Sequence, residues 1–394
     1  MTDNPYSPFD FQPRTRVIFG PGSLERVGQC ARELGGKKIL LVTDKGIVAA
    51  GHADHCRRIL AQEHLALTVF DAVRENPTTR DVDACRQMAG RAGIDLIVGL
   101  GGGSSMDTAK GCNFLLSNGG QMRDYWGVGK AAKPMLPLIA VPTTAGTGSE
   151  CQSFALIAIE ETHQKMACGD PKAAARVAIL DPLLTLSQPT PVTAHTGIDA
   201  VAHAVETAVT KKQNPLSLLF SREAFKLCAT NFERVLKNPK DLEARGKMLL
   251  GAAFGGTAIE NSMLGAAHSA ANPLTAHFGV VHGEAVGIML PHVVEFNAHD
   301  EKAAHGYADL AAAAKIVAGN GHVKEAVSEL KKTLGRLLNS AKVPRSLADY
   351  GVKPDAIPIL ADEAATQWTA AFNPRALTTK DFAKLYTAAL EARE

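Results

Sequence analysis

The stretch that decides the fold is "VGLGGGSSMDTAKG" (residues 98–111), in which glycines follow an apolar run and precede a helical pattern. Glycines at such a turn let backbone N–H groups approach a phosphate, and the helix N-terminus adds its partial positive charge. Ser104 and Ser105 can cap that helix and also donate to phosphate oxygens. An ordinary tight turn explains an isolated glycine cluster equally well, so a phosphate site needs a second indication.

The glycine cluster departs from the standard dinucleotide fingerprint, which belongs in the first strand-to-helix turn. Here it follows the third predicted strand, and Ser104 stands where the last glycine would fall. A second turn, "PTTAGTGSE" (142–150), supplies further glycines and hydroxyls after another buried strand. Two such loops at the carboxyl ends of neighbouring strands predict a crevice for a nucleotide diphosphate. Asp44, after "LLVT", is either an acceptor for ribose hydroxyls or the cap of the next turn.

Around these turns, short apolar runs alternate with helical patterns. The residues between the first strands, such as 51–63 and 80–92, have helical length, which predicts a parallel α/β sheet. A hairpin is predicted at 154–160 and around Met166. The predicted buried strands are 37–44, 65–73, 95–102, 136–144 and 176–182.

From about residue 190 strand-like runs end, and alanine- and leucine-rich helical periodicity continues almost to the end of the chain. The proline-bearing stretch "DPLLTLSQPTP" (181–191) marks the boundary. The sequence therefore predicts an α/β domain at residues 1–188 and an all-helical domain at residues 189–394.

The composition is that of a globular protein with a formal net charge of +2 and no long run of one sign, which argues against a nucleic-acid binder. Seven cysteines stand at irregular spacing without a CxxC pair, as expected of reduced thiols in the cytoplasm. We find neither a signal-peptide pattern at the N-terminus nor an apolar run long enough to span a membrane. The expectation is a soluble cytoplasmic protein.

Candidate metal ligands begin the helical part, in "HTGIDAVAHAVE" (195–206). Asp199 and His203 are four residues apart, so on a helix they share one face and can bind a single ion. Glu206 lies near the same face. A structural hydrogen bond is the alternative explanation for the Asp–His pair alone.

Two further histidines strengthen the metal interpretation. His268 and His282 lie in "GAAHSAANPLTAHFGVVHG" (265–283), where Pro273 is expected to interrupt or bend a helix and bring both side chains to one point. One carboxylate and three imidazoles form a coherent shell for a divalent transition metal, and iron, zinc and nickel all suit it.

The chain resembles the iron-containing (group III) alcohol dehydrogenases, from "FGPGSL" (19–24) to "NPRALT" (373–378). Matching blocks in the family's order include "GGGSSMDTAKG", "PTTAGTGSE", "GIDAVAHAVE" and "HGEAVGIMLPHVVEFN". The resemblance implies the dehydroquinate synthase-like architecture, an N-terminal α/β nucleotide domain and a helical domain that holds the metal.

The resemblance also implies site residues, position by position. The metal ligands fall on Asp199, His203, His268 and His282, with Fe2+ expected and Zn2+ as the alternative. An aspartate at position 44 implies NAD in preference to NADP. The implied nucleotide contacts are Asp44, Asn76, Gly102, Gly103, Ser104, Ser105, Asp107, Thr143, Thr144, Thr147 and Lys165.

One position departs from the family. Relatives usually carry a histidine four residues after the first late ligand, near the nicotinamide, where this chain has Asn272. Asparagine forms hydrogen bonds but does not titrate near neutral pH. His277 is an extra histidine in the same segment, which either replaces the missing group or is a surface residue. Asn272 and His277 are therefore the candidates for substrate positioning or proton transfer.

The predicted function is reversible hydride transfer between NAD(H) and a small alcohol/aldehyde or ketone pair, with a metal that polarises the substrate oxygen. Two alternatives are a related enzyme of the dehydroquinate synthase or glycerol dehydrogenase type, and a non-catalytic nucleotide-binding sensor. A homo-oligomer, dimeric or larger, is usual in the family and is expected here, with no nucleic-acid or membrane partner.

Overall fold

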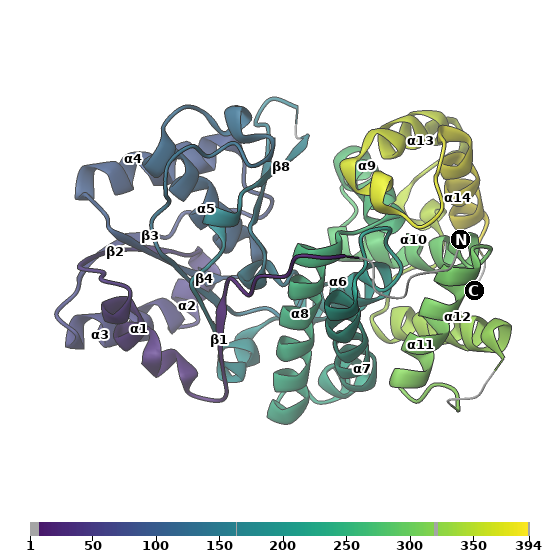
Figure 1. The fold of residues 1–394 in the computed structure, drawn as a ribbon, viewed down its shortest axis with the longest axis horizontal. Helices are drawn as coiled ribbons and strands as arrows, with labels where there is room; N and C mark the ends of the chain where they lie inside the picture. Colours follow the sequence, from purple (N-terminus) through teal and green to yellow (C-terminus); the bar gives the residue numbers. More distant parts are fainter. Residues whose placement is uncertain (1–7, 163, 319–321, 393–394) are drawn as a thin grey trace. The chain divides into compact units, whose positions relative to one another are not determined.

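The computed structural model describes residues 8–162, 164–318 and 322–392, and it divides into two compact units. The α/β unit comprises Arg14–Pro189 and Lys240–Ala253. The helical unit comprises the described N-terminal residues up to Pro13, together with Thr190–Pro239 and the described residues from Phe254 onward. The colours of Figure 1 follow the chain through both units.

A six-stranded parallel sheet forms the centre of the α/β unit, with strand order β1-β9-β6-β4-β2-β3. All five predicted buried strands are confirmed. A further strand, β1, was missed, so the glycine turn follows the fourth strand of the chain and not the third. The strands are β1 (Arg16–Phe19), β2 (Lys38–Val42), β3 (Ala66–Phe70), β4 (Leu96–Gly101), β6 (Leu138–Pro142) and β9 (Val177–Leu180).

Helices cover both faces of this sheet, because each buried strand presents apolar side chains alternately to either side. Along β2, Ile39 and Leu41 pack with α1 (Val27–Glu33) and α3 (His52–Gln62). Leu40 and Val42 point to the other face and pack with α4 (Thr79–Ala92) and α5 (Gly103–Asn118). Figure 1 shows the two pairs of helices on opposite sides of the sheet.

The chain between β4 and β9 also forms a smaller three-stranded sheet, with strand order β5-β8-β7. Its antiparallel pair, β7 (Phe154–Ala158) and β8 (Lys165–Gly169), confirms the predicted hairpin. Strand β5 (Gly127–Val128) adds to β8 in parallel.

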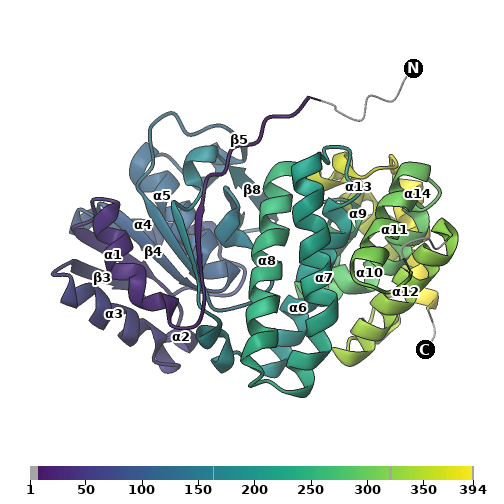
Figure 2. The ribbon, with the colours of Figure 1, turned by 60° about the horizontal axis from the view of Figure 1, so that its bottom comes forward.

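The helical unit confirms the prediction of a helical C-terminal part. Within it, α6 packs against α7 and α10, and α9 packs against α10 and α13, as Figure 2 shows for α6 and α7. The unit contains α6 (Thr190–Thr207), α7 (Pro215–Lys237), the later part of α8 (Leu242–Ser262), α9 (Ala266–Phe278), α10 (His282–Asn297), α11 (Glu301–Ala313), α12 (Val323–Ser340), α13 (Ile357–Thr366) and α14 (Thr379–Glu391).

The chain does not break where the proline predicts. Helix α9 runs through Pro273 and ends at Gly279, whose φ of 65° is the left-handed conformation that glycine adopts without strain. His282 then begins α10. The expected interruption at Pro273 is wrong, and the reversal of direction that it was meant to supply comes six residues later.

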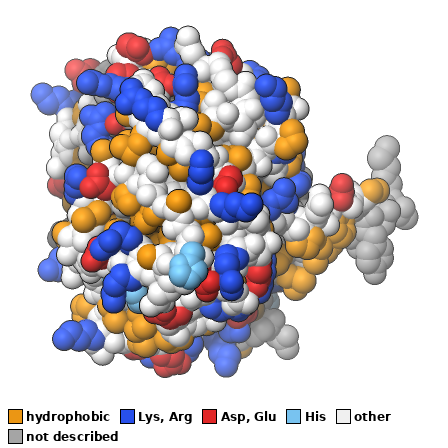
Figure 3. Space-filling view, turned by 90° about the vertical axis from the view of Figure 1, so that its left-hand side faces the viewer, with side chains coloured by type: hydrophobic (Ala, Val, Ile, Leu, Met, Phe, Trp, Pro, Cys, Tyr) orange, Lys and Arg blue, Asp and Glu red, His pale blue; other side chains and the backbone are white. Residues whose placement is uncertain are grey.

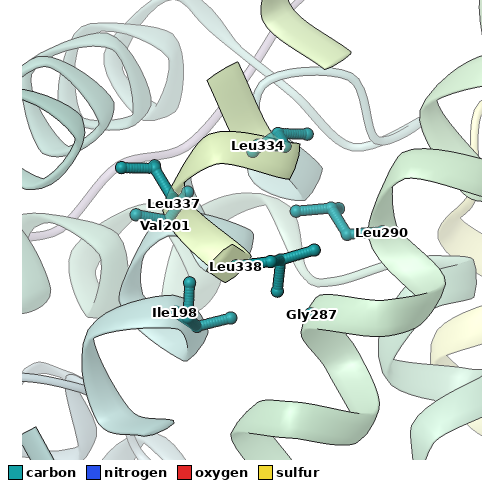
Figure 4. Close-up of a pocket in the computed structure, with 7 residues that line it drawn as sticks. All are labelled: Ile198, Val201, Gly287, Leu290, Leu334, Leu337 and Leu338. Carbon is teal, nitrogen blue, oxygen red and sulfur yellow. The ribbon is translucent and has the colours of Figure 1, made fainter. Parts of the chain in front are cut away.

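Apolar packing fills the space between α6, α10 and α12. A small cavity there is lined only by apolar residues and Gly287 (Figure 4), namely Ile198, Val201, Gly287, Leu290, Leu334, Leu337 and Leu338. Such a cavity offers no polar group to a substrate, so the side chains around it serve packing.

The surface drawn in Figure 3 carries Lys and Arg side chains interspersed with Asp and Glu. Among the described residues, no helix has both the length and the apolar character needed to cross a membrane.

Candidate metal centre and nucleotide site

Helix α6 supplies the first half of the metal centre. Asp199 and His203 lie one turn apart on a buried face, and His203 Nε2 is 3.3 Å from Asp199 Oδ1. The neighbouring side chains Ile198, Val201 and Ala202 are apolar and buried, so the aspartate lies away from bulk water. A carboxylate in such surroundings needs a compensating positive group.

Helices α9 and α10 supply the other half. Nε2 of His268 lies 3.4 Å and Nε2 of His282 lies 4.0 Å from the same Asp199 oxygen. The ligand atoms of Asp199, His268 and His282 all lie within 4.8 Å of one another. The structure therefore brings together the four side chains that the sequence predicted as metal ligands.

The start of α10 comes close enough because Gly283 follows His282. A Cβ atom at position 283 would lie 2.1 Å from the carbonyl oxygen of His195, in the first part of α6. The contact is reinforced by Glu284, which accepts from Tyr350 at 2.8 Å and pairs with His195 Nε2 at 2.8 Å. This His195–Glu284–Tyr350 contact could not be predicted from local sequence, because its members lie far apart in the chain.

In the four-residue cluster, the effect of neighbouring charges on the pKa values outweighs the effect of burial. Burial raises the pKa of Asp199, but His203, His268 and His282 outweigh it and hold the pKa well below the usual range. Burial disfavours the charged form of His268, but Glu206 and Asp199 outweigh it and raise the pKa to about 9. The cluster is a set of histidines organised around one negative oxygen.

Oδ1 of Asp199 and Nε2 of His268 face each other at 3.4 Å, and neither forms a hydrogen bond of normal geometry with a described residue. A buried polar atom without a partner costs on the order of 1–3 kcal/mol, and a divalent cation bound to both atoms would remove that cost. Three imidazoles and one carboxylate match the ligand preferences of iron and zinc, so the residues present fit such a metal.

Asn272 and His277, the two candidates for substrate positioning or proton transfer, lie in different surroundings. Asn272 lies one turn after His268 on α9 and donates from Nδ2 to Gln367 Oε1 at 3.0 Å. His277 lies nine residues after His268, about 13 Å along the helix axis. Its side chain is 36% exposed and pairs with Glu363 at 2.8 Å, so His277 does not join the ligand cluster.

The α/β unit places Asp44 beside the glycine turn. Strands β2 and β4 are parallel neighbours, yet β2 is followed in the chain by β3 on its other side, so the strand order reverses between β2 and β4. Ligands bind at such a reversal, outside the carboxyl ends of the strands. Asp44 follows β2 and Gly101 ends β4, and Ser105 Oγ lies 3.5 Å from Asp44 Oδ2. Asp44 also caps α2 (Lys45–Ala49), accepting from Ile47 N–H.

The two glycine-rich loops touch each other, because β4 pairs with β6. A Cβ atom at Gly103 would lie 2.7 Å from Thr147 Cγ2, and one at Gly102 would lie 3.4 Å from Thr144 Cγ2. At Gly101, φ is 150° and a Cβ would lie 2.4 Å from Ser105 Oγ. Close contact therefore requires glycine at positions 101 and 103, whereas position 102 has room for a Cβ atom. The three glycines place no side chain over the backbone amides at the start of α5.

The other predicted nucleotide contacts surround these loops. Asp107 on α5 accepts from Ser149 Oγ at 2.9 Å, and its pKa is raised to about 6, mainly by removal from water. Lys165 begins β8 and lowers the pKa of Asp107 from its position nearby. Asn76 is exposed after β3, with φ of 51°.

Lys110, which was not among the predicted site residues, is fully buried beneath the second loop. Its Nζ donates to Ser149 O at 2.6 Å, Ser149 Oγ at 2.8 Å and Phe154 O at 2.9 Å. The lysine thus fastens α5 to residues 149–154. The signal available in the sequence was its place in "GGGSSMDTAKG", between apolar residues of a helix that both neighbouring strands predict to be buried.

An α/β unit with glycine turns at its strand reversal and a helical unit with a buried Asp–His cluster define a nucleotide- and metal-dependent enzyme. Two family models match the chain: iron-containing alcohol dehydrogenase at residues 13–182 and the C-terminal region of the same family at residues 193–390. This protein belongs to the iron-containing alcohol dehydrogenase family.

Curated relatives and solved structures agree with that assignment. The chain is 34% identical to alcohol dehydrogenase 4 of Schizosaccharomyces pombe, covering 95% of this chain and 87% of the relative. It is 32% identical to the NAD-dependent methanol dehydrogenase of Bacillus methanolicus, covering 96% and 99%. The crystal structure of a 1,3-propanediol oxidoreductase, 32% identical, superposes with a TM-score of 0.94 over 98% of this chain and 100% of that one.

These findings confirm the prediction of an NAD-dependent, metal-containing alcohol dehydrogenase. They also favour that activity over the dehydroquinate synthase type, glycerol dehydrogenase type and sensor alternatives.

Proposed function

We propose that the protein transfers a hydride reversibly between NAD(H) and a small alcohol/aldehyde pair at the Asp199 cluster. The observation that carries the proposal is the buried Asp199 oxygen with three imidazole nitrogens at 3.3, 3.4 and 4.0 Å. Three imidazoles and a carboxylate directed at one point form a ligand set that suits a divalent transition metal.

The proposed ligands are Asp199, His203, His268 and His282. A divalent iron held by them supplies Lewis acidity toward an alcohol or carbonyl oxygen, as zinc would. The chain's own contribution is to hold three imidazoles and one carboxylate together, with His268 and His203 stacked so that their ring centroids are 4.9 Å apart. Apolar neighbours exclude water, which strengthens every charge interaction in the site.

For the dinucleotide, we propose that the backbone of Gly102 and Gly103 and the hydroxyls of Ser104 and Ser105 bind the diphosphate. Their place at the start of α5 supports this, because a helix N-terminus favours an anion. Thr143, Thr144 and Thr147 form the second wall. Asp44 accepts from ribose hydroxyls and repels a 2′-phosphate, which favours NAD over NADP. Asn76, Asp107 and Lys165 complete the proposed set.

We propose a small primary alcohol or diol as substrate, in line with relatives named for methanol and 1,3-propanediol. Asn272 is the proposed positioning residue. It lies about 6 Å along the helix from His268, and Gln367 fixes its carboxamide. His277, farther along and paired with Glu363, is the weaker candidate for that role.

Metal analysis coupled to an NAD/NADH screen tests the activity. The purified protein should contain about one equivalent of a divalent transition metal, and NADH should accumulate with at least one small alcohol. Removal of the metal by a chelator should abolish NADH formation, and Fe2+ or Zn2+ should restore it. NADH formation that persists in metal-free protein would contradict the proposal.

The roles of Asn272 and His277 are separated by their pH profiles. Asn272→His should introduce an ionisation near pH 6–7 into the profile of kcat/KM, because imidazole titrates there and a carboxamide does not. His277→Ala should leave the rate and the profile within about twofold of the parent, since an exposed ion pair contributes little. If His277→Ala instead removes an ionisation that the parent shows, His277 is the proton-transfer group and Asn272 is not needed for it.

We further propose a homo-oligomer in a reducing, cytoplasmic compartment. Strand β1 lies at the edge of the sheet and exposes Val17 and Phe19. A second copy of the chain that packed on this edge would remove both side chains from water. All seven cysteines are buried free thiols, as a reducing compartment maintains them. Light scattering of the purified protein measures the oligomeric state directly.

A further inference from the structure

Helix α9, which carries His268, begins without a cap of its own. Its N-cap residue is Gly265, which has no side chain to accept from the first amides. Two distant side chains accept instead. Asn373 Oδ1 accepts from Ala266 N–H at 3.2 Å, and Glu206 Oε1 accepts from Ala267 N–H at 2.7 Å. Side chains from two other parts of the helical unit thus fix the start of α9.

Glu206 has a second contact that Asn373 lacks. Its other oxygen, Oε2, lies 2.5 Å from Nδ1 of His268. Both residues are buried: the exposed fraction of Glu206 is 4% and that of His268 is 5%. One carboxylate therefore holds both the backbone at the start of α9 and the ring that α9 carries.

This contact decides which ring nitrogen carries the hydrogen. A carboxylate only accepts hydrogen bonds, so Nδ1 of His268 must be the donor. The lone pair of the neutral ring is then on Nε2, the atom 3.4 Å from Asp199 Oδ1. Space for the arrangement is kept by Gly265, where a Cβ would lie 2.9 Å from Asn373 Oδ1 and 3.1 Å from Glu206 Oε1.

We propose that Glu206 is a positioning residue that fixes the tautomer and direction of His268 and thereby sets the affinity of the metal centre. The inference rests on the metal site of the proposed function. It assigns to Glu206 no contact with metal or substrate, because both carboxylate oxygens already accept hydrogen bonds within the protein.

Glu206→Gln is the sharpest test, because the side chain keeps its size and loses one acceptor. Glutamine has one oxygen for two N–H groups. The Ala267 amide cannot move its hydrogen, whereas imidazole can shift its own to Nε2, where a metal must bind. Metal binding must then reverse this arrangement, so the loss is expected in metal affinity. Loss of a partner of this kind weakens binding by roughly 10–100-fold.

The experiment measures Zn2+ affinity of the whole chain by competition with a chromophoric chelator, together with thermal unfolding of the metal-free protein. Ser269→Ala is the matched control. It removes a buried hydroxyl beside His268, which donates to Gly265 O at 3.0 Å, without touching the ring. The control should lose stability and keep the Zn2+ affinity within about threefold of the parent, since effects on separate contacts are nearly independent.

The outcomes separate the two hypotheses. If the parent chain binds no Zn2+ or Fe2+, the proposed function fails. If the parent binds and Glu206→Gln binds equally well, or Ser269→Ala loses as much affinity, only the role of Glu206 is overturned. Should Glu206→Gln fail to fold, Glu206→Asp keeps a carboxylate one methylene shorter, and its Zn2+ affinity should still fall. An unchanged affinity for a folded Glu206→Asp protein would also overturn the proposal.

Discussion

Asp199→Ala should abolish tight metal binding and turnover together. Its Oδ1 is the oxygen that three imidazole nitrogens surround, so its loss removes both a ligand and the negative charge that faces His203 and His282. Loss of an outer partner already costs roughly 10–100-fold in affinity, so loss of a ligand should cost more than about 100-fold. Metal content by elemental analysis and kcat with NAD and a small alcohol measure the two effects.

Asp309→Ala serves as the control for Asp199→Ala. Asp309 is an exposed carboxylate of the same helical unit, paired with Arg222, and its removal should leave metal content and kcat unchanged. Turnover that survives in a metal-free Asp199→Ala protein would show that the Asp199 cluster is not the reacting site.

Local patterns predicted most of the fold. A strand that is buried on both faces, such as β4, forms a continuous apolar run, and a helix such as α4 shows its own period. Strand β1 was missed because it is short and at the sheet edge. Its apolar run, Val17 to Phe19, has only three residues, and of the four strand residues only Ile18 is buried. Its place beside β9 depends on pairing between residues 161 positions apart in the chain, such as Arg16 and Val177.

The metal ligands were predictable as residue types, but their convergence was not. The spacing of Asp199 and His203 follows from the helix period alone. His268 and His282 reach them because the chain turns at Gly279 and because Gly283 lets α10 approach His195. Pro273 predicted an interruption or bend, since proline usually ends a helix, but one lost hydrogen bond in a well-packed helix did not suffice to break α9.

Buried polar partners were the least predictable part. Glu206 reads as one more carboxylate on the face of α6, and its bonds to Ala267 and His268 depend on a segment about sixty residues away. Lysine is rarely buried fully, so its residue type argues against an interior position and outweighs the one local signal, its place on a helix predicted to be buried. What fixes its position is the loop at 149–154, whose two carbonyls and one hydroxyl converge on Nζ.

Lys110→Met should destabilise the α/β unit by about 3–5 kcal/mol, because a buried charge network loses one partner. The methionine leaves Ser149 O and Phe154 O without their donor, and Asp107 loses the positive charge that lowers its pKa. Unfolding is best followed in a Trp368→Phe background. The chain has two tryptophans, and Trp126 then reports on the α/β unit alone. Lys45→Met is the control, since Lys45 is exposed in a surface pair and its loss should cost less than about 1 kcal/mol.

The pH dependence distinguishes a charge role of Lys110 from simple packing. Burial raises the pKa of Glu150 to about 7 and that of Asp107 to about 6, above their ordinary values of 4.5 and 3.8. Between those values the folded chain binds more protons than the unfolded chain, so these two groups lower stability as pH rises from about 4 to 7.

Without Lys110 both pKa values should rise further, because its charge lowers each of them. The deficit of Lys110→Met should therefore be larger at pH 8, where the carboxylates are ionised, than at pH 5. An equal deficit at both pH values would mean that the lysine acts through its hydrogen bonds to the loop alone, and that its charge does not balance Asp107 and Glu150.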